Sequence, residues 1–173
     1  MADILLSLKV KDYGQMTIEL YPQVAPNTVA NFVDYVESKF YNGLIFHRII
    51  KGLMIQGGGG VEKKAPIKGE FKANGFTNDL KHTKGVISMA RTNDPNSATS
   101  QFFIMHKDSP HLDGQYAAFG KVIEGLDIVD KIATVRTNHY DQPYDDVVIE
   151  SFTVLEKNVE LPKVKYVWKT LSL

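Results

Sequence analysis

The first twenty residues alternate between hydrophobic and polar side chains. Residues 4–10 place Ile, Leu, Leu and Val at every second position, and the alternation resumes over 16–20 after a short Asp-Tyr-Gly segment. Successive side chains of a strand point to opposite faces, so each run has one face to bury. Two such runs joined by a short loop that contains glycine predict an antiparallel hairpin.

Two later segments have helical periodicity instead. In each, hydrophobic residues are spaced three or four apart, which gathers them on one helix face. Pro26 suits a first helical turn, because the N–H that it lacks has no partner there. The first stripe, which predicts a helix over 27–38, consists of Val29, Phe32, Val33 and Val36. The second stripe predicts a helix between two strands and consists of Leu126, Val129, Ile132 and Ala133.

Six further short runs, rich in aromatic and branched residues, predict additional strands. No internal repeat and no strand–helix alternation is present, which counts against Rossmann and TIM architectures. The pattern predicts a β-barrel or sandwich whose open ends are covered by helices, with residues 57–84 as a long loop. The runs are 45–50, 53–56, 86–90, 101–105, 117–123 and 147–155.

Composition narrows the possible functions. The chain has 173 residues, 20 basic against 20 acidic residues, and no cysteine. That length fits one domain. Zero net charge argues against a nucleic-acid partner, which would require a basic surface. The lack of cysteine excludes disulfides, thiolate chemistry and zinc sites built on cysteine, and it fits a reducing compartment. No stretch of 18 residues lacks a charge, and Asp3 stands where a signal peptide carries a base. We therefore expect a cytoplasmic protein without a membrane span.

Common cofactor motifs do not fit the sequence. The run Gly57–Gly60 is followed neither by Lys-Ser/Thr nor by the third Rossmann glycine, since position 62 is Glu62. No Gly-x-Ser-x-Gly nucleophile motif is present. The histidines have no spacing typical of a metal site, so we expect no metal and no cofactor. They are His47, His82, His106, His111 and His139.

Three polar residues interrupt hydrophobic strand faces. Alternation places Arg48 on one face with Phe46 and Ile50, and Gln101 on one face with Phe103 and Met105; Gln56 ends the run 53–56. A guanidinium on a hydrophobic stripe is costly unless it is paired or faces a groove. One interpretation is a hydrophobic pocket with a few convergent polar groups. A buried Arg–Gln network or an exposed sheet edge fits the pattern equally well.

The sequence around these residues resembles the cyclophilin-type peptidyl-prolyl cis–trans isomerases. FHRIIKGLMIQGG at 46–58 resembles the central signature of that family, and the segments GVISMAR at 85–91 and NSATSQFFI at 96–104 match its second. LDG at 112–114 and FGKV at 119–122 match its third. The resemblance covers residues 3–156, and Met-Ala-Arg-Thr at 89–92 is most similar to bacterial single-domain members.

The resemblance implies a closed eight-stranded antiparallel β-barrel with two capping helices, and isomerisation of X–Pro bonds during protein folding. It implies that Arg48 is the catalytic residue. Proline-containing polypeptides are the implied partners of a monomeric enzyme, without nucleic acid or membrane. The positions that the resemblance assigns to substrate binding are Leu53, Met54, Gln56, Ala90, Arg91, Gln101, Phe103, His111, Leu112 and Tyr116.

Three of these positions depart from the usual family pattern. Leu53 and Tyr116 stand where the family usually has Phe and His, which alters the expected proline pocket. His111 stands where members sensitive to cyclosporin have Trp, so we expect weak cyclosporin binding. These departures leave open a non-catalytic module that binds proline-containing segments. A lipocalin-like barrel fits the periodicity but not the motifs.

The residues after the last predicted strand form a separate feature. We divide the chain into an isomerase domain, 1–156, and a C-terminal extension, 157–173, whose role the sequence does not reveal. The extension is basic, and Val164, Tyr166 and Trp168 stand at every second position, with Lys163, Lys165 and Lys169 among their neighbours. An added edge strand is one interpretation of that alternation. We favour an extension that packs on the barrel.

Overall fold

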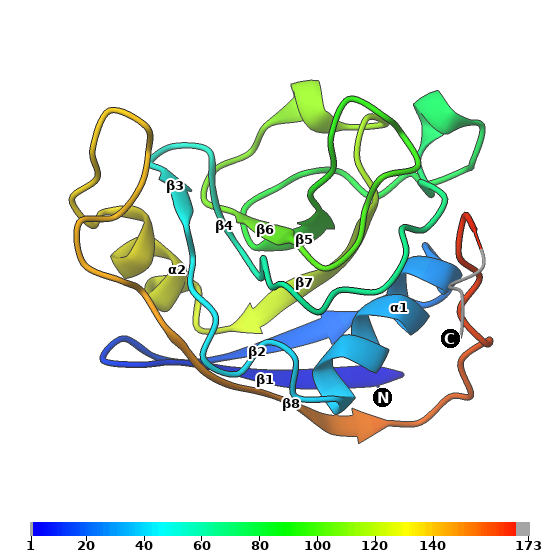
Figure 1. The fold of residues 1–173 in the computed structure, drawn as a ribbon, viewed down its shortest axis with the longest axis horizontal. Helices are drawn as coiled ribbons and strands as arrows, with labels where there is room; N and C mark the ends of the chain where they lie inside the picture. The colour runs from blue at the N-terminus through cyan, green and yellow to red at the C-terminus, as the bar shows by residue number, and fades with distance from the viewer. Residues whose placement is uncertain (1, 169–173) are drawn as a thin grey trace.

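The computed structural model describes residues 2–168 (Figure 1). The helices are α1 (Pro26–Glu37) and α2 (Leu126–Ala133), with short 3-10 turns η1 (Lys72–Asn74) and η2 (Pro110–Leu112). The strands are β1 (Ile4–Val10), β2 (Gly14–Leu20), β3 (Arg48–Ile50), β4 (Met54–Gly57), β5 (Val86–Met89), β6 (Phe102–Met105), β7 (Ala118–Glu124) and β8 (Ile149–Lys157). Both predicted helices and the N-terminal hairpin are confirmed; α1 is shifted by one residue from its predicted ends, and β2 begins two residues earlier than predicted.

All eight strands belong to one sheet with the order β3-β4-β6-β5-β7-β2-β1-β8, and each paired neighbour is antiparallel. In the hairpin, Ile4 pairs with Leu20 and Leu6 with Ile18, so the hydrophobic positions of both strands share one face. Figure 1 shows the sheet curling around its interior, with β1, β2 and β8 opposite β3 to β6. The mainly antiparallel β-architecture predicted from the sequence is therefore confirmed.

The sheet does not close by a complete ladder, so the prediction of a fully closed barrel is not confirmed. Within residues 2–168 the edge strands β3 and β8 share no ladder. The segments before the two strands are linked by the isolated bridge Ile45–Val148 and by bonds such as Phe46 N–H to the Val147 carbonyl at 2.9 Å. The strand predicted over 45–50 covers only the three residues Arg48–Ile50. A curled, open sheet results.

The interior of the curled sheet is the main hydrophobic core, and the helices cover its ends. Phe32 of α1 is fully buried and contacts four aromatic rings at centroid distances of 5.0–5.5 Å, those of Tyr41, Phe102, Phe119 and Phe152. α2 buries Ile128, Val129 and Ile132 at the other end. Neither helix within residues 2–168 is long and hydrophobic enough to cross a membrane.

A second, smaller hydrophobic cluster lies on the outer face of β4, β5 and β6. Its buried members are Met54, Val86, Phe103, Met105 and Ala118. Strand alternation produces the two clusters, because Ile55 and Ile104 point inward while Met54 and Phe103 point outward. Phe46 is fully buried in the main core, whereas Arg48 is exposed. The predicted common face of Phe46 and Arg48 is therefore wrong, because the backbone is irregular between them.

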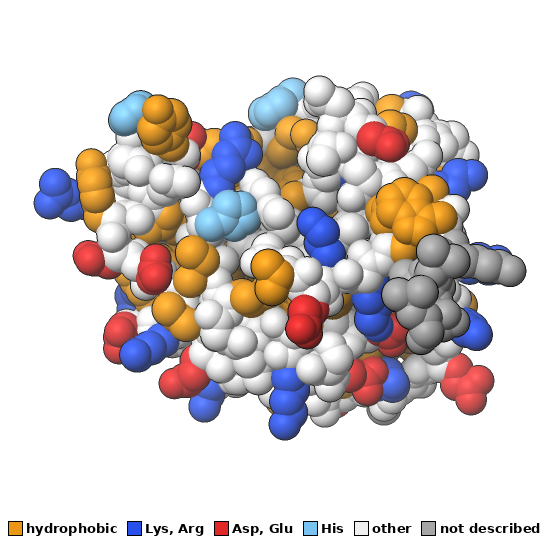
Figure 2. Space-filling model, viewed as in Figure 1, with side chains coloured by type: hydrophobic (Ala, Val, Ile, Leu, Met, Phe, Trp, Pro, Cys, Tyr) orange, Lys and Arg blue, Asp and Glu red, His pale blue; other side chains and the backbone are white. Residues whose placement is uncertain are grey.

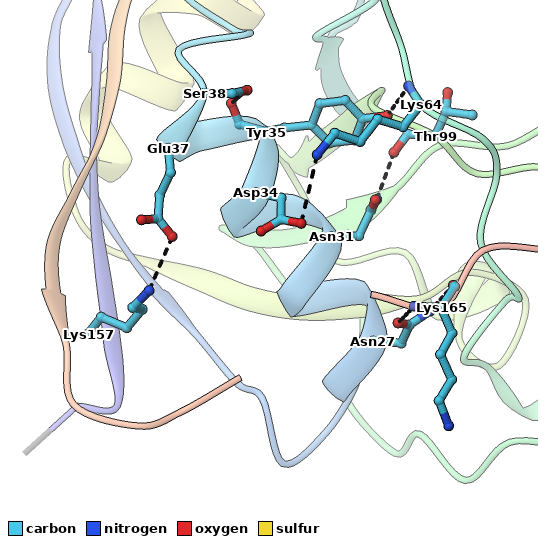
Figure 3. Close-up of polar contacts among 10 residues, drawn as sticks. All are labelled: Asn27, Asn31, Asp34, Tyr35, Glu37, Ser38, Lys64, Thr99, Lys157 and Lys165. Carbon is cyan, nitrogen blue, oxygen red and sulfur yellow. Dashed lines mark hydrogen bonds and ion pairs between the residues drawn. The ribbon is translucent and has the colours of Figure 1, made fainter. Parts of the chain in front are cut away.

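The extension does not form the edge strand that the alternation allowed. Residues 158–168 have no strand and pass beside the N-terminal end of α1 (Figures 1 and 3), and residues 169–173 fall outside the described part. The Asn27 amide donates to the Lys165 carbonyl at 2.9 Å and accepts from its N–H at 2.8 Å. Partly buried side chains pack against the main core, namely Val159, Leu161, Val164 and Tyr166. Because one side-chain amide occupies both backbone groups of Lys165, the chain here docks without a ladder.

Candidate active site

Arg48 stands on the outer face of β3 and is oriented by neighbouring strands. The β3–β4 register places it opposite Gln56, and its Nη1 donates to Gln56 Oε1 at 3.3 Å. Gln56 Nε2 in turn donates to Gln101 Oε1 at 2.9 Å. Within residues 2–168 Arg48 has no carboxylate within 4.0 Å. The three polar residues singled out in the sequence therefore form one chain that points a charged donor along the surface.

A hydrophobic cavity of about 240 Å³ adjoins this chain. Met54 and Phe103 are almost completely buried at its base. Figure 2 shows a hollow near the top of the view, with hydrophobic side chains on one wall and a Lys or Arg side chain on the other. The cavity is lined by Arg48, Leu53, Met54, Gln56, Ala90, Arg91, Phe103, Leu112 and Tyr116. Strands β3, β4 and β6 provide its base, and the segments after β5 and around η2 provide its walls.

Phe103 packs against a buried histidine, His82, whose pairing with Asp113 sequence reasoning missed. Its ring lies edge-on to Tyr116 at 5.5 Å and stacks on His82 at 6.0 Å. His82 Nδ1 lies 3.1 Å from Asp113 Oδ1, and Nε2 lies 2.9 Å from Ser88 Oγ. Burial lowers the pKa of His82, and Asp113 partly opposes that shift. The sequence offered no local signal for this pair, because Asp113 is 31 residues away from His82.

Arg91 forms a rigid part of the opposite wall. Its guanidinium carbon lies 4.9 Å from the centroid of the Phe71 ring and 4.6 Å from that of Tyr116. Its Nε and Nη2 donate to the Gln115 carbonyl at 3.2 and 2.7 Å, and its Nη1 donates to the Thr92 carbonyl at 2.8 Å. Two aromatic faces and three hydrogen bonds therefore fix the position of this charge.

The structure brings most of the sequence-predicted site residues around one cavity. Gln101 does not line it but holds Gln56, and its carbonyl accepts the Ala90 N–H at 3.0 Å. His111 lies on η2, is exposed, and does not line the cavity. Among residues 2–168, no three His, Asp or Glu side chains gather closely enough to hold a metal ion.

The lining residues favour binding and electrostatic stabilisation over covalent chemistry. The cavity wall carries no Ser, Thr, Cys, Lys or carboxylate as a nucleophile or base. It combines a concave hydrophobic surface with a guanidinium that stays protonated. Beside Arg48, burial and the Arg48 charge lower the pKa of His47. Such a site can hold a small hydrophobic ring and present a charged donor to its edge.

The sequence matches a known family over most of its length. The family described as cyclophilin type peptidyl-prolyl cis-trans isomerase/CLD matches residues 5–154. Peptidyl-prolyl cis-trans isomerase B of Escherichia coli is 47% identical over 163 residues, covering 84% of this chain and 96% of that protein. A peptidyl-prolyl cis-trans isomerase of Acinetobacter baylyi is 47% identical over 151 residues, covering 81% of this chain and 77% of that protein.

The fold agrees with solved structures of the same family. A cyclophilin type peptidyl-prolyl cis-trans isomerase of Cryptosporidium parvum superposes with a TM-score of 0.79 at 29% identity, covering 88% of this chain and 98% of that chain. A second structure of that protein, in the presence of the dipeptide Ala-Pro, gives a TM-score of 0.78 at 29% identity and covers 88% and 99%. The family match confirms the resemblance inferred from the signature segments. This chain belongs to the cyclophilin-type peptidyl-prolyl cis–trans isomerases, and it is an isomerase of that type.

Proposed function

We propose that the chain isomerises X–Pro bonds of proline-containing polypeptides with Arg48 as its catalytic residue. One observation carries this assignment. The Arg48 guanidinium is oriented by Gln56 at the edge of a hydrophobic cavity whose volume suits a proline ring. The Ala-Pro dipeptide used with the Cryptosporidium relative supports the same substrate class.

The reaction needs stabilisation of a twisted amide and breaks no covalent bond. Amide resonance sets a rotation barrier of about 18–20 kcal/mol, although the two X–Pro isomers differ by only about 0.5–1 kcal/mol. A 10⁴-fold acceleration needs about 5–6 kcal/mol of transition-state stabilisation. In the twisted state the prolyl nitrogen loses resonance and gains a basic lone pair. A guanidinium aimed at that nitrogen therefore binds the transition state more strongly than the planar amide.

The remaining lining residues take positioning roles in this proposal. Met54, Phe103 and Leu112 hold the proline ring while the other side of the peptide bond rotates. Gln56 orients the guanidinium, and Gln101 holds Gln56. The substrate backbone pairs with the chain at 90–91, next to the β5 end. Leu53 and Tyr116 border the ring and set substrate preference, and His111 lies outside the cavity on η2; each of the three departs from the usual family residue.

Arg48→Ala tests the catalytic assignment. We expect kcat/KM to fall at least about 100-fold, the loss seen when one charge-stabilising donor is removed. The measurement is the exchange rate between isomers of an Ala-Pro peptide by NMR. Arg136→Ala is the matched control, because Arg136 is exposed and lies over the Tyr144 ring at 5.7 Å, away from the cavity. Turnover by Arg48→Ala within threefold of the control would refute the assignment.

A second candidate is a module that binds proline-containing segments without useful turnover. The altered pocket residues Leu53 and Tyr116 favour it, whereas the Arg48–Gln56–Gln101 chain favours catalysis. Affinity and exchange rate measured on the same peptide separate the two. Tight binding without acceleration of exchange would establish the binding module.

We further propose that residues 1–156 form the isomerase domain and that residues 157–173 are an extension packed on it. The family match over 5–154 supports this boundary, and so does the end of β8 at Lys157. We propose a monomer acting in the cytoplasm, consistent with the lack of cysteine. We also propose weak cyclosporin binding, because His111 offers less hydrophobic surface than Trp. Sedimentation, fractionation and a cyclosporin titration test these three points.

A further inference from the structure

The cavity wall carries two positive charges and no negative one. Arg48 and Arg91 line it together with uncharged residues only. Within residues 2–168 neither guanidinium has a carboxylate within 4.0 Å. The whole chain is neutral, with 20 basic and 20 acidic residues, and Figure 2 shows both signs interspersed over the lower part of that face. The excess of positive charge is therefore a local property of the cavity.

Arg91 keeps its charge at the wall because its side chain is clamped. Its guanidinium contacts two aromatic rings, that of the almost fully buried Phe71 and that of Tyr116. All three of its hydrogen-bond contacts go to the carbonyls of Thr92 and Gln115, which are dipoles without net charge. A guanidinium has five N–H donors, so two of them have no partner among the described residues.

The nearby acidic residue that follows Leu112 does not neutralise this wall. The Asp113 carboxylate accepts the His82 backbone N–H at 2.6 Å and contacts the His82 ring at 3.1 Å. Both contacts lie behind Phe103, because His82 stacks on the Phe103 ring. Gln56, Gln101 and Gln115 supply only neutral amides.

We propose that Arg91 gives this enzyme a preference for substrates that carry Glu or Asp next to the isomerised proline. The inference rests on the proposed function, since it concerns the same cavity. A residue next to proline has its Cα about 3.8 Å from the proline Cα across a trans bond and about 2.9 Å across a cis bond, which brings its side chain to the cavity rim. A carboxylate there meets two fixed guanidinium groups, whereas a lysine meets two like charges. Charges held beside a partly dry cavity interact more strongly than charges in bulk water.

The size of the preference follows from Coulomb's law. Two unit charges about 8 Å apart at an effective dielectric constant of about 40 change binding about fivefold, in opposite directions for the two signs. Salt screening at physiological ionic strength reduces this effect. We therefore expect kcat/KM to differ about tenfold between otherwise identical Glu and Lys peptides, with Gln in between.

The experiment measures isomer exchange by NMR on peptides that differ only at the residue before proline, with Glu, Gln or Lys there. A second set varies the residue after proline. Exchange NMR avoids the sequence preference of a coupling protease. We expect the Glu/Lys ratio of about ten to fall to about three in Arg91→Gln and to remain above five in Arg91→Lys. The matched control Arg136→Gln, a remote arginine over Tyr144, should keep the wild-type ratio. In 0.5 M salt the wild-type ratio should shrink about threefold.

The outcomes separate this inference from the proposed function. Wild-type protein that accelerates no peptide would overturn the proposed function itself. Acceleration of all peptides with a Glu/Lys ratio near one would overturn the charge preference alone. A wild-type ratio that Arg91→Gln leaves unchanged would show that Arg91 does not set it. A ratio lost in Arg91→Gln and retained in Arg136→Gln supports the proposal.

Discussion

Replacing Glu70 by Gln tests how helix α1 begins. The N-cap residue of α1 is Ala25, and no cap hydrogen bond comes from its side chain. The Glu70 carboxylate, from the loop before η1, instead accepts the N–H of Thr28 at 2.6 Å and that of Asn27 at 3.4 Å. It also accepts the Thr28 hydroxyl at 2.7 Å. Glu70, which is 42 residues from Thr28 in the sequence, thus serves as the helix cap, and it is almost fully buried.

The expected loss follows from these contacts. Hydrogen bonds to a charged group contribute about 1.5–3 kcal/mol, and a negative charge at a helix N-terminus adds about 0.3–1 kcal/mol. Gln keeps one carbonyl oxygen for Thr28, but its NH₂ group then faces the Asn27 N–H, donor against donor. We expect Glu70→Gln to lower the free energy of unfolding by about 2–3 kcal/mol. For a chain of this length that corresponds to a fall in Tm of about 5–10 °C.

Thermal and urea denaturation measure this loss, with Glu37→Gln as the matched control. Glu37 lies on the same helix, but its side chain is 49% exposed where it pairs with Lys157 at 3.2 Å (Figure 3). An exposed pair contributes at most about 1 kcal/mol. Equal shifts in the two variants would refute the capping argument.

Three further predictions follow from the structure. Because burial lowers the pKa of His82, the unfolded chain binds more protons below about pH 6.5, so the Tm should fall from pH 7.5 to pH 5. A flat or rising Tm toward pH 5 would contradict this, and His82→Gln should weaken the dependence. Removing residues 158–173 should lower the free energy of unfolding by about 2–4 kcal/mol, because it exposes the surface of α1. The turnover of short peptides should stay unchanged, and a loss of turnover would assign the extension a catalytic role. Gly58→Ala should destabilise the fold by about 2–3 kcal/mol, because φ is +84° and the new methyl group meets the Tyr41 ring at 2.8 Å. Gly52→Ala, at φ +85° with free space around it, should cost about 1 kcal/mol, and equal losses in the two would count against the steric argument.

Local periodicity was sufficient to predict both helices and most of the strands. The stripe from Val29 to Val36 predicted α1, and alternation over 4–10 and 16–20 predicted the first hairpin. These patterns predict structure because each element buries the hydrophobic side chains of one face, and backbone geometry fixes how far apart in sequence those side chains are. Periodicity failed at 45–50. Phe46 and Arg48 are two residues apart, as on one strand face, but Phe46 points into the main core and Arg48 is exposed on the outside. The bonds from 43–46 to 147–149 overrode alternation there, and no local pattern contains them.

The candidate site, too, was only partly predictable from the sequence. Alternation brought Arg48, Gln56 and Gln101 to attention as polar groups on hydrophobic faces, and the signature segments gave them a family context. Alternation left open whether they form a network, an edge or a pocket. The register of β3, β4 and β6 decided this, because it places the three side chains in hydrogen-bonding sequence beside Phe103.

The sequence by itself determined the neutral composition, the family and most helices and strands, since the periodicity and the signature segments that show them depend on residues near one another in the chain. Tertiary structure alone decided which distant partners meet. It left the sheet open at β3 and β8, capped α1 with Glu70, joined His82 to Asp113 and clamped Arg91 between Phe71 and Tyr116. Hydrogen bonds and aromatic contacts between segments depend on strand register and loop path, and these are set by packing of the whole chain.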